Sequence, residues 1–263
     1  MDSIDPRLRN RLWNTFSSTC KTYGAAFLSN PEASDLRARV RAIWHSYFER
    51  PLDTIPDYWP NCYQELREYF FHCGWNEVYD FLEFIAGLFK DQQRRQFTDA
   101  CNLILENDLS AYRFVGTEIV EITSPEEISS IEEATGLPTR LGPAASHIAR
   151  ALELMADRKN RDYRNSIKES ISAIEAVSKI ISGNKKVSLA EALRDLGPKI
   201  GLHPAQVKAF EILYGFTSDA HGIRHALLDQ PSLSFEDAKF MLVACSAFVN
   251  YLVGKLAKSG LQF

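Results

Sequence analysis

The stretch KNRDYRNSIKESISAIEAVSKIISG, residues 159–183, carries the clearest fold signal in the chain. Its apolar positions recur at intervals of three and four residues, at Ile167, Ile171, Ile174, Val177 and Ile181. This spacing places them on one face of an α-helix, and the glycine that ends the stretch is a natural stop. The segment therefore predicts a long amphipathic helix within a helical domain.

Two further features of this predicted helix concern its neighbours. Ser166, Ser170 and Ala173 are small and lie near the apolar stripe, so a second helix could approach closely there. Glu169 projects roughly 130° from the centre of the stripe at about 100° per residue. Its carboxylate is expected either in solvent or turned toward a site or a partner.

The connection ahead of this helix is basic. It holds Arg158, Lys159, Arg161 and Arg164 around Tyr163. Basic residues with an interleaved aromatic ring suit a nucleic-acid backbone and a stacked base. A solvated, basic helix start explains the same residues equally well.

The densest group of titratable side chains lies further along, in LYGFTSDAHGIRHALLD, residues 213–229. His221 and His225 are four residues apart, which puts them on one face of a helix, and Arg224 precedes the second. Histidine titrates near neutral pH and arginine keeps its charge, so the group suits proton transfer at a phosphodiester. A structural role, with Asp219 as a helix N-cap and Arg224 paired with a carboxylate, is the alternative.

The rest of the chain is also predicted to be mainly helical. Helices are expected over 4–21, 34–48 and 91–106, and two more between 61 and 89, split near Gly74. The eight aromatic residues between Tyr63 and Phe84 are expected in a core rather than in an exposed groove or ligand cage. Alternating apolar residues around a glycine predict a β-hairpin over 110–122, and Ser124 starts a short helix. Toward the C-terminus we expect a short helix from Ser188 with a Gly-Pro break, a helix from about Pro204 and an apolar last helix.

These elements predict an all-α fold, apart from the hairpin, with two helical halves. We expect an N-terminal helical domain over 1–109, a hairpin and short-helix connector over 110–140, and an up-and-down bundle of about four helices over 141–263. The first 140 residues carry 14 basic and 22 acidic residues and the remainder 16 and 12. The C-terminal half is therefore the better candidate for a polyanion surface.

The composition excludes several classes of protein. The 45% hydrophobic and 24% charged residues are ordinary for a globular protein. The N-terminus predicts no signal peptide, and the longest uncharged segment, Phe240 to Gly254, is shorter than the roughly 20 residues of a membrane span. Five scattered cysteines without a CxxC pair predict reduced thiols in a cytoplasmic protein and argue against a zinc site or a disulfide framework. We expect no metal, no cofactor and no membrane partner.

Several strings resemble a known family. The N-terminal strings LRNRLWN (8–14), YFERPLDTIP (47–56) and YFFHCGWNEVYDFLEFI (69–85) resemble the N-terminal domain of AbiJ-type abortive-infection proteins. The strings DRKNRDYRNSIKESISAIEAV (157–177), YGFTSDAHGIRHALLD (214–229) and AKFMLVACSAFVNYL (238–252) resemble the HEPN-like C-terminal domain of the same proteins. The resemblance covers nearly the whole chain.

The resemblance implies an antiviral, metal-independent endoribonuclease that acts as a homodimer through its C-terminal half. In such a mechanism the RNA 2′-hydroxyl attacks the adjacent phosphate, assisted by a histidine and an arginine. The residues this would involve are His225 and Arg224 as catalytic groups, His221 and Asp219 in support, Glu169 as a polar wall, and Lys159, Arg161, Tyr163 and Arg164 for RNA binding. The family arginine would fall on Tyr214, however, so a non-catalytic dimeric module that binds RNA, a nucleotide or a protein is the alternative.

Overall fold

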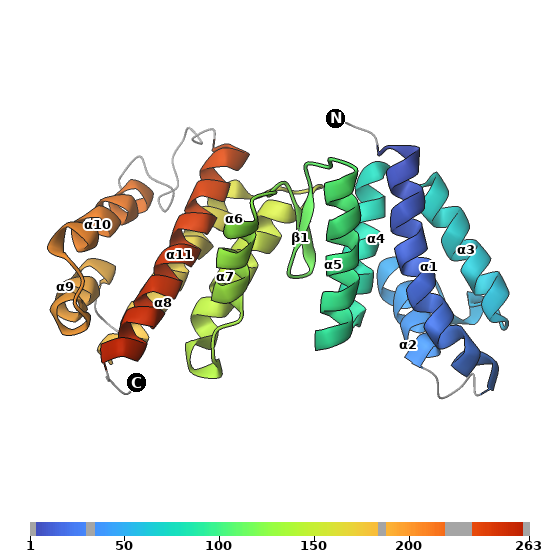
Figure 1. Cartoon of the computed structure of the whole chain (residues 1–263), viewed down its shortest axis with the longest axis horizontal. Helices are drawn as coiled ribbons and strands as arrows, with labels where there is room; N and C mark the ends of the chain where they lie inside the picture. The colour runs from blue at the N-terminus through green and yellow to red at the C-terminus, as the bar shows by residue number, and fades with distance from the viewer. Residues whose placement is uncertain (1–3, 30–34, 184–187, 219–232, 260–263) are drawn as a thin grey trace. The chain divides into compact units, whose positions relative to one another are not determined.

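The computed structural model describes residues 4–29, 35–183, 188–218 and 233–259. Within these ranges the chain forms eleven α-helices and one two-stranded antiparallel sheet (Figure 1). The predicted mainly helical fold class is therefore confirmed. By internal contacts the chain divides into two compact units, Met1–Glu121 and Ile122–Phe263.

Unit 1 is built from five α-helices and a hairpin. Its elements in chain order are α1 (Pro6–Ser29), α2 (Asp35–Ala42), the π-helix η1 (Ile43–Tyr47), the 3₁₀-helix η2 (Leu52–Thr54), α3 (Trp59–His72), α4 (Trp75–Leu88), α5 (Asp91–Asn107), β1 (Arg113–Val115) and β2 (Glu118–Val120). The predicted split near Gly74 and the predicted hairpin are both confirmed. The helix expected over 34–48 ends instead in a π-helical turn, in which the Phe48 amide donates to the carbonyl of Ile43.

Aromatic rings fill the core of unit 1. The ring of Phe81 is fully buried, and its centroid lies 5.2 Å from that of Phe16, 5.5 Å from Tyr47 and 5.9 Å from Phe70. These rings come from four helical elements, so Phe81 joins α1, η1 and α3 to α4. All eight aromatic residues between Tyr63 and Phe84 are buried or half-buried. The predicted core role of this segment is confirmed.

The hairpin is anchored to the helices by two polar side chains. Its strands pair in the register Phe114↔Ile119, and the turn contains Gly116 with a φ of 61°. On the outer edge of β1, the Asn102 side chain accepts from the Phe114 amide at 2.6 Å and donates to the Phe114 carbonyl at 3.0 Å. On β2, the carboxylate of Glu83 accepts from the amide of Ile119. Helices α4 and α5 therefore hold both strands.

Unit 2 is helical throughout its described residues. Its elements are α6 (Pro125–Thr135), the 3₁₀-helix η3 (Thr139–Leu141), α7 (Gly142–Ala156), α8 (Tyr163–Ser182), α9 (Leu189–Ile200), α10 (Pro204–Ser218) and α11 (Phe235–Ser259). Helix α8 packs against both α7 and α11. The hairpin belongs to unit 1 and α6 to unit 2, so the connector expected over 110–140 is divided between the two units.

Helices α7 and α8 approach each other closely, as the small residues predicted. The buried Ser166 hydroxyl of α8 donates to the Ala151 carbonyl of α7 at 2.7 Å. Ser166, Ser170 and Ala173 are all fully buried. A hydroxyl can reach a backbone carbonyl of another helix only where the two backbones lie near one another. Helix α8 ends at Gly183, whose φ of 68° confirms the predicted stop.

The predicted Gly-Pro break near residue 197 is wrong. Gly197 and Pro198 lie inside α9, which ends at Gly201 with a φ of 67°. Pro198 sits in the last turn, where its missing N–H costs a single helical hydrogen bond. A Cβ on Gly197 would lie 3.2 Å from Cγ2 of Val207. Glycine at this position therefore lets α10 pack against α9, which explains the pair without a break.

Helix α11 is long and apolar and is buried along one face only. Nine of its residues are buried, among them Met241, Cys245 and Val249. By length and composition it is the one described helix that could cross a membrane, and 44% of its most apolar window is buried inside the protein. A core helix of a globular protein has the same composition. The predicted core role therefore holds for one face, and the other face is exposed.

The cysteines give a direct test of this packing. All five are free thiols, and four of them are buried. Burial raises the pKa of Cys20 to about 12 and those of Cys62 and Cys73 to about 11, and it raises the pKa of Cys101 and Cys245 further. Raising a thiol pKa by about two units lowers its thiolate fraction about 100-fold. We expect slow labelling by a disulfide reagent near pH 8 in the native protein and rapid labelling of five thiols in denaturant. Fast native labelling of two or more thiols would contradict the packing.

Candidate functional site

The structure describes five of the nine predicted site residues, all in unit 2. Glu169 lies in the middle of α8, Tyr163 and Arg164 lie in its first turn, and Lys159 and Arg161 lie in the connection from α7. The other four, Asp219, His221, Arg224 and His225, lie outside the described residues. The described part of the candidate site therefore lies on α7, α8 and the connection between them.

Glu169 is paired with a histidine that the sequence analysis did not single out. The Nδ1 atom of His147 on α7 lies 2.6 Å from Oε2 of Glu169. An ionised carboxylate only accepts hydrogen bonds, so Nδ1 donates and Nε2 is the acceptor whenever the ring is neutral. The two side chains are 37% and 24% exposed. The Glu169 carboxylate is therefore paired with an imidazole of the neighbouring helix and is still partly exposed.

A guanidinium lies close to this pair. Arg150 stands three residues after His147, on the same side of α7, and its Nη1 donates to Glu153 at 2.8 Å. That hydrogen bond, together with the negative charges of Glu153, Glu169 and Asp162, raises the pKa of Arg150. We call His147, Arg150, Asp162 and Glu169 the α7–α8 polar edge. It combines an oriented imidazole with a permanent positive charge.

The basic connection is held in shape by carboxylates at both ends. Oδ1 of Asp157 accepts from the amides of Lys159 and Asn160, each at 2.9 Å. The side chain of Asp162 caps α8 by accepting from the Asn165 amide, also at 2.9 Å. Lys159 and Arg161 between these anchors are exposed. The connection is thus an ordered loop that presents cationic side chains to solvent.

The aromatic residue of this segment is partly covered. Tyr163 is half-buried, and its ring meets that of Phe235 on α11 edge-on, with 6.3 Å between centroids. Its hydroxyl accepts from Nη1 of Arg161 at 3.2 Å. Arg164, in the next position, is half-buried as well. Tyr163 therefore fixes the start of α8 against α11 and orients one arginine of the basic segment.

This arrangement suits proton transfer at a phosphodiester. An imidazole whose Nδ1 is fixed by a carboxylate presents Nε2 as a proton acceptor, and a nearby guanidinium stabilises negative charge on a phosphate. Among the described residues, no group of three or more histidine, cysteine, aspartate or glutamate side chains is arranged to hold a metal ion.

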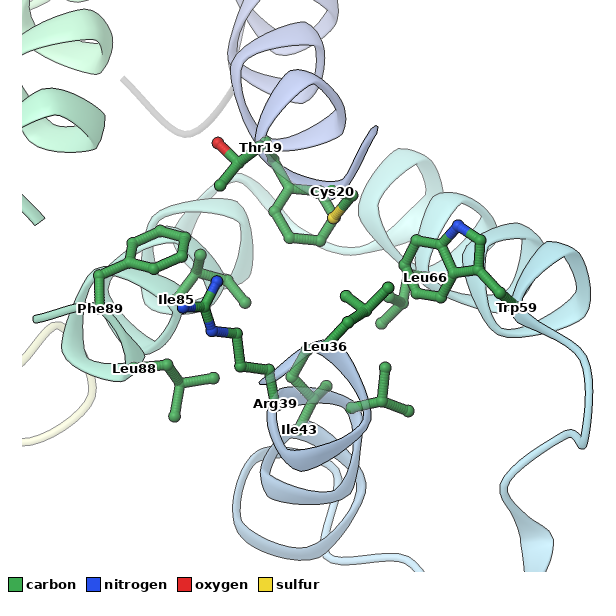
Figure 2. A pocket seen from close by; sticks show the side chains of 12 residues that line it. Thr19, Cys20, Leu36, Arg39, Ile43, Trp59, Leu66, Ile85, Leu88 and Phe89 are labelled. Carbon is green, nitrogen blue, oxygen red and sulfur yellow. The ribbon is translucent and has the colours of Figure 1, made fainter. Parts of the chain in front are cut away.

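Unit 1 contains an apolar cavity between α1, α2, α3 and α4 (Figure 2). Its lining includes Phe16, Cys20, Leu36, Trp59 and Phe89, and its charged member is Arg39. The guanidinium of Arg39 lies over the Phe89 ring, 4.7 Å from its centroid. The cavity has a volume of about 20 Å³, which holds about one water molecule. We therefore interpret it as a packing gap in the core rather than as a ligand site.

Taken with its composition, the architecture defines a two-unit, mainly helical protein with an acidic N-terminal part and a polar edge in its second unit. The sequence model of the family described as AbiJ N-terminal domain 4 matches residues 1–136. The chain therefore belongs to this family. The domain indicates an abortive-infection-related protein. The match covers unit 1 and α6, and it confirms the N-terminal part of the resemblance. No curated protein and no solved structure matches the chain.

Proposed function

We propose that this chain is an abortive-infection protein whose second unit is a HEPN-like, metal-independent endoribonuclease. Membership of the AbiJ N-terminal domain 4 family supports the biological role. The described observation that supports the chemical part is the 2.6 Å pair of His147 and Glu169, which places an oriented imidazole beside the residue that the resemblance assigns to the wall of the site. This pair lies beside Arg150 on the hairpin whose connection presents Lys159 and Arg161. RNA is the substrate that this combination of cationic loop and acid–base group fits best.

The proposed reaction is an internal transfer at phosphorus. An imidazole accepts the proton of the RNA 2′-hydroxyl, whose oxygen attacks the adjacent phosphate. The bond to the 5′-oxygen of the next nucleotide breaks, that oxygen takes up a proton from water, and the imidazolium returns its proton to water. The products are a 2′,3′-cyclic phosphate and a 5′-hydroxyl end, and arginine stabilises the charge that develops on the phosphate. The resemblance assigns these roles to His225 and Arg224, supported by His221 and Asp219, with Glu169 as a polar wall.

A second function is favoured by one residue. Tyr214 on α10 stands where the family arginine would fall, and it is half-buried. Without that arginine, the same unit would serve as a non-catalytic module that binds RNA, a nucleotide or a protein partner. The two functions differ in whether RNA is cut.

Cleavage is tested with purified wild type and the His225→Ala variant on total RNA and tRNA in the presence of EDTA, with end-group analysis. We expect fragments ending in 2′,3′-cyclic phosphate from the wild type and a loss of at least about 100-fold in the variant, the typical contribution of a general acid–base group. His45→Ala, an exposed histidine of unit 1, is the matched control and should cut normally. Equal cleavage by His225→Ala contradicts the assignment, and RNA binding without cleavage in the wild type supports the binding module.

A separate prediction concerns the contribution of the basic α7–α8 connection to RNA affinity. Neutralising Lys159 and Arg161 together, as Lys159→Gln and Arg161→Gln, should lower the slope of log K against log salt by about 1.4, because each phosphate contact to a single strand contributes about 0.7. The matched control neutralises Lys199 and Lys208, two exposed lysines elsewhere in unit 2. The slope is measured by fluorescence anisotropy with a labelled single-stranded RNA. An equal change in both double variants would show that the effect is one of net charge.

A further inference from the structure

Helices α9 and α10 of unit 2 pack against each other and leave a groove that lies outside the candidate site. The groove has a volume of about 360 Å³, which falls within the range of about 300–1,000 Å³ that is usual for ligand pockets. Its lining comes from one side of α9, from the turn that follows it and from the facing side of α10. We call this feature the α9–α10 groove.

The inner part of the α9–α10 groove is aliphatic. Leu202 and Val207 are buried beneath it, and Pro198 and Pro204 are exposed at its sides. Gly197 adds no side chain to the space between the two helices. None of the described residues that line the groove is aromatic. The surface therefore accepts an aliphatic side chain, but it offers no ring on which a nucleobase could stack.

One end of the α9–α10 groove carries two cations with unused donors. Nε of Arg194 donates to Oε1 of Glu211 at 2.7 Å, and the Arg194 side chain is 64% exposed. The four N–H groups on its Nη1 and Nη2 atoms, and the exposed Nζ of Lys208, have no acceptor within the described part of the chain. Lys208 stands one turn before Glu211 on the same side of α10. A carboxylate bound at this end would therefore receive donors from both helices.

The α9–α10 groove also contains acceptors, which argue for a peptide and against a nucleic acid. The Glu211 side chain is 17% exposed and places a negative charge beside the two cations. Pro198 has no N–H, so the Arg194 carbonyl lacks its usual helical donor. A peptide backbone supplies both N–H and C=O groups to such a surface. A nucleic-acid strand carries a negative charge on every phosphate, which Glu211 would repel.

We propose that the α9–α10 groove binds a short segment of a partner protein in which an aliphatic side chain stands next to an acidic one. The aliphatic side chain packs against Leu202, Val207 and the two prolines, and the carboxylate accepts from Arg194 and Lys208. Helix α9 runs about 10 Å from Arg194 to Gly201 at about 1.5 Å per residue, which matches about three residues of an extended peptide. The inference concerns recognition of a partner and holds whether or not the protein cuts RNA.

Fluorescence anisotropy with the full chain and a labelled hexapeptide of alternating leucine and aspartate, blocked at both ends, tests the ligand class. We expect binding with a dissociation constant between about 1 µM and 1 mM, as for a short peptide that buries few side chains. Peptides with asparagine in place of aspartate, or serine in place of leucine, should bind at least about tenfold more weakly. A wild type that binds all three peptides equally, or none of them at about 1 mM, would overturn the proposal.

A pair of lysine variants tests the place of binding. Lys208→Glu should raise the dissociation constant of the leucine–aspartate peptide at least about tenfold, because it replaces attraction by repulsion. Lys199→Glu is the matched control, since Lys199 is exposed on α9 and does not line the groove. It should bind like the wild type, and circular dichroism checks that both variants are folded. Equal weakening in the two variants would reveal an effect of net charge and would contradict binding in the groove.

The Arg194–Glu211 pair distinguishes ligand binding from a structural role. Arg194→Gln should weaken peptide binding, because it removes the guanidinium. Glu211→Gln should strengthen it, because it removes the neighbouring negative charge and leaves the guanidinium in place. If the pair only held α9 against α10, both variants would break the same bond and would change binding in the same direction. Weaker binding by both variants would therefore overturn the assignment of Arg194.

A nucleic acid is the alternative occupant of the α9–α10 groove, and competition tests it. The competitor is a single-stranded oligodeoxyadenylate, which lacks the 2′-hydroxyl and cannot be cut by the proposed reaction. Peptide binding that persists in its presence supports the peptide assignment. If the strand displaces the peptide, and Lys208→Glu but not Lys199→Glu weakens its own binding, the groove is a nucleic-acid surface and the peptide proposal is overturned.

Discussion

Replacing Phe81 by alanine is expected to lower the free energy of unfolding of unit 1 by about 3–5 kcal/mol, the usual cost of removing a buried aromatic ring. Phe81 has no exposed surface, and its ring contacts those of Phe16, Tyr47, Tyr69 and Phe70. These contacts join four helical elements, so no single element can move in to close the cavity without giving up its other contacts. The loss should fall at the upper end of this range.

The measurement is urea denaturation followed by circular dichroism, with hydrogen exchange to assign the change to unit 1. Tyr58→Ala is the control, because Tyr58 is 71% exposed and forms no side-chain cap on α3. Exposed substitutions of this kind usually change stability by less than about 0.5 kcal/mol. A loss below about 1 kcal/mol for Phe81→Ala would show that the aromatic core is not packed as described.

Replacing Ser166 by leucine is expected to destabilise unit 2 by about 3 kcal/mol or more, at the upper limit of typical overpacking costs. Ser166 is fully buried, and its hydroxyl lies 2.7 Å from the Ala151 carbonyl. The space beside it is occupied by the backbone of α7, which cannot change rotamer as a side chain can. A leucine must therefore separate α7 from α8 and strain the contacts on both helices.

A short series separates the hydrogen bond from the steric effect. Ser166→Ala removes the hydroxyl without adding volume and should cost only about 1 kcal/mol. Ser172→Leu introduces the same leucine at a half-buried position of α8 whose hydroxyl bonds within its own helix, and it should cost much less than Ser166→Leu. Thermal and urea unfolding give the three values. Similar losses for Ser166→Leu and Ser172→Leu would contradict a close α7–α8 contact.

The helices of this chain were predictable because their apolar residues follow the helical period. The stripe from Ile167 to Ile181 and the stop at Gly183 define α8 without tertiary information. Two local features were not predictable. The π-helical turn at Ile43–Tyr47 differs from an α-helix by one residue in hydrogen-bond register, and it coincides with the burial of Trp44 and the partial burial of Tyr47 among aromatic rings. The Gly197–Pro198 pair stays helical because α10 packs onto the glycine, a contact made by a separate element.

Part of the candidate site was also predictable from the helical period. The angle of Glu169 around its helix follows from counting residues, so a carboxylate turned away from the core was expected. Its partner His147 could not be identified, because the register of α7 against α8 depends on how the 157–162 connection turns and how closely Ser166 approaches Ala151. The basic character of that connection was visible directly, while the contact of Tyr163 with Phe235 depends on the packing of α11.

The side-chain anchors of the small sheet bear on how this protein avoids aggregation. A two-stranded sheet consists of edges alone, and free edges recruit strands from other chains. Here the side chain of Asn102 forms hydrogen bonds with both the amide and the carbonyl of Phe114 at the outer edge of β1. The carboxylate of Glu83 accepts a hydrogen bond from the amide of Ile119 at the outer edge of β2. An incoming strand would have to displace these side chains before it could bond. Asn102 and Glu83 thus act as gatekeepers that let the chain keep a β-hairpin among helices without offering a template for intermolecular β-structure.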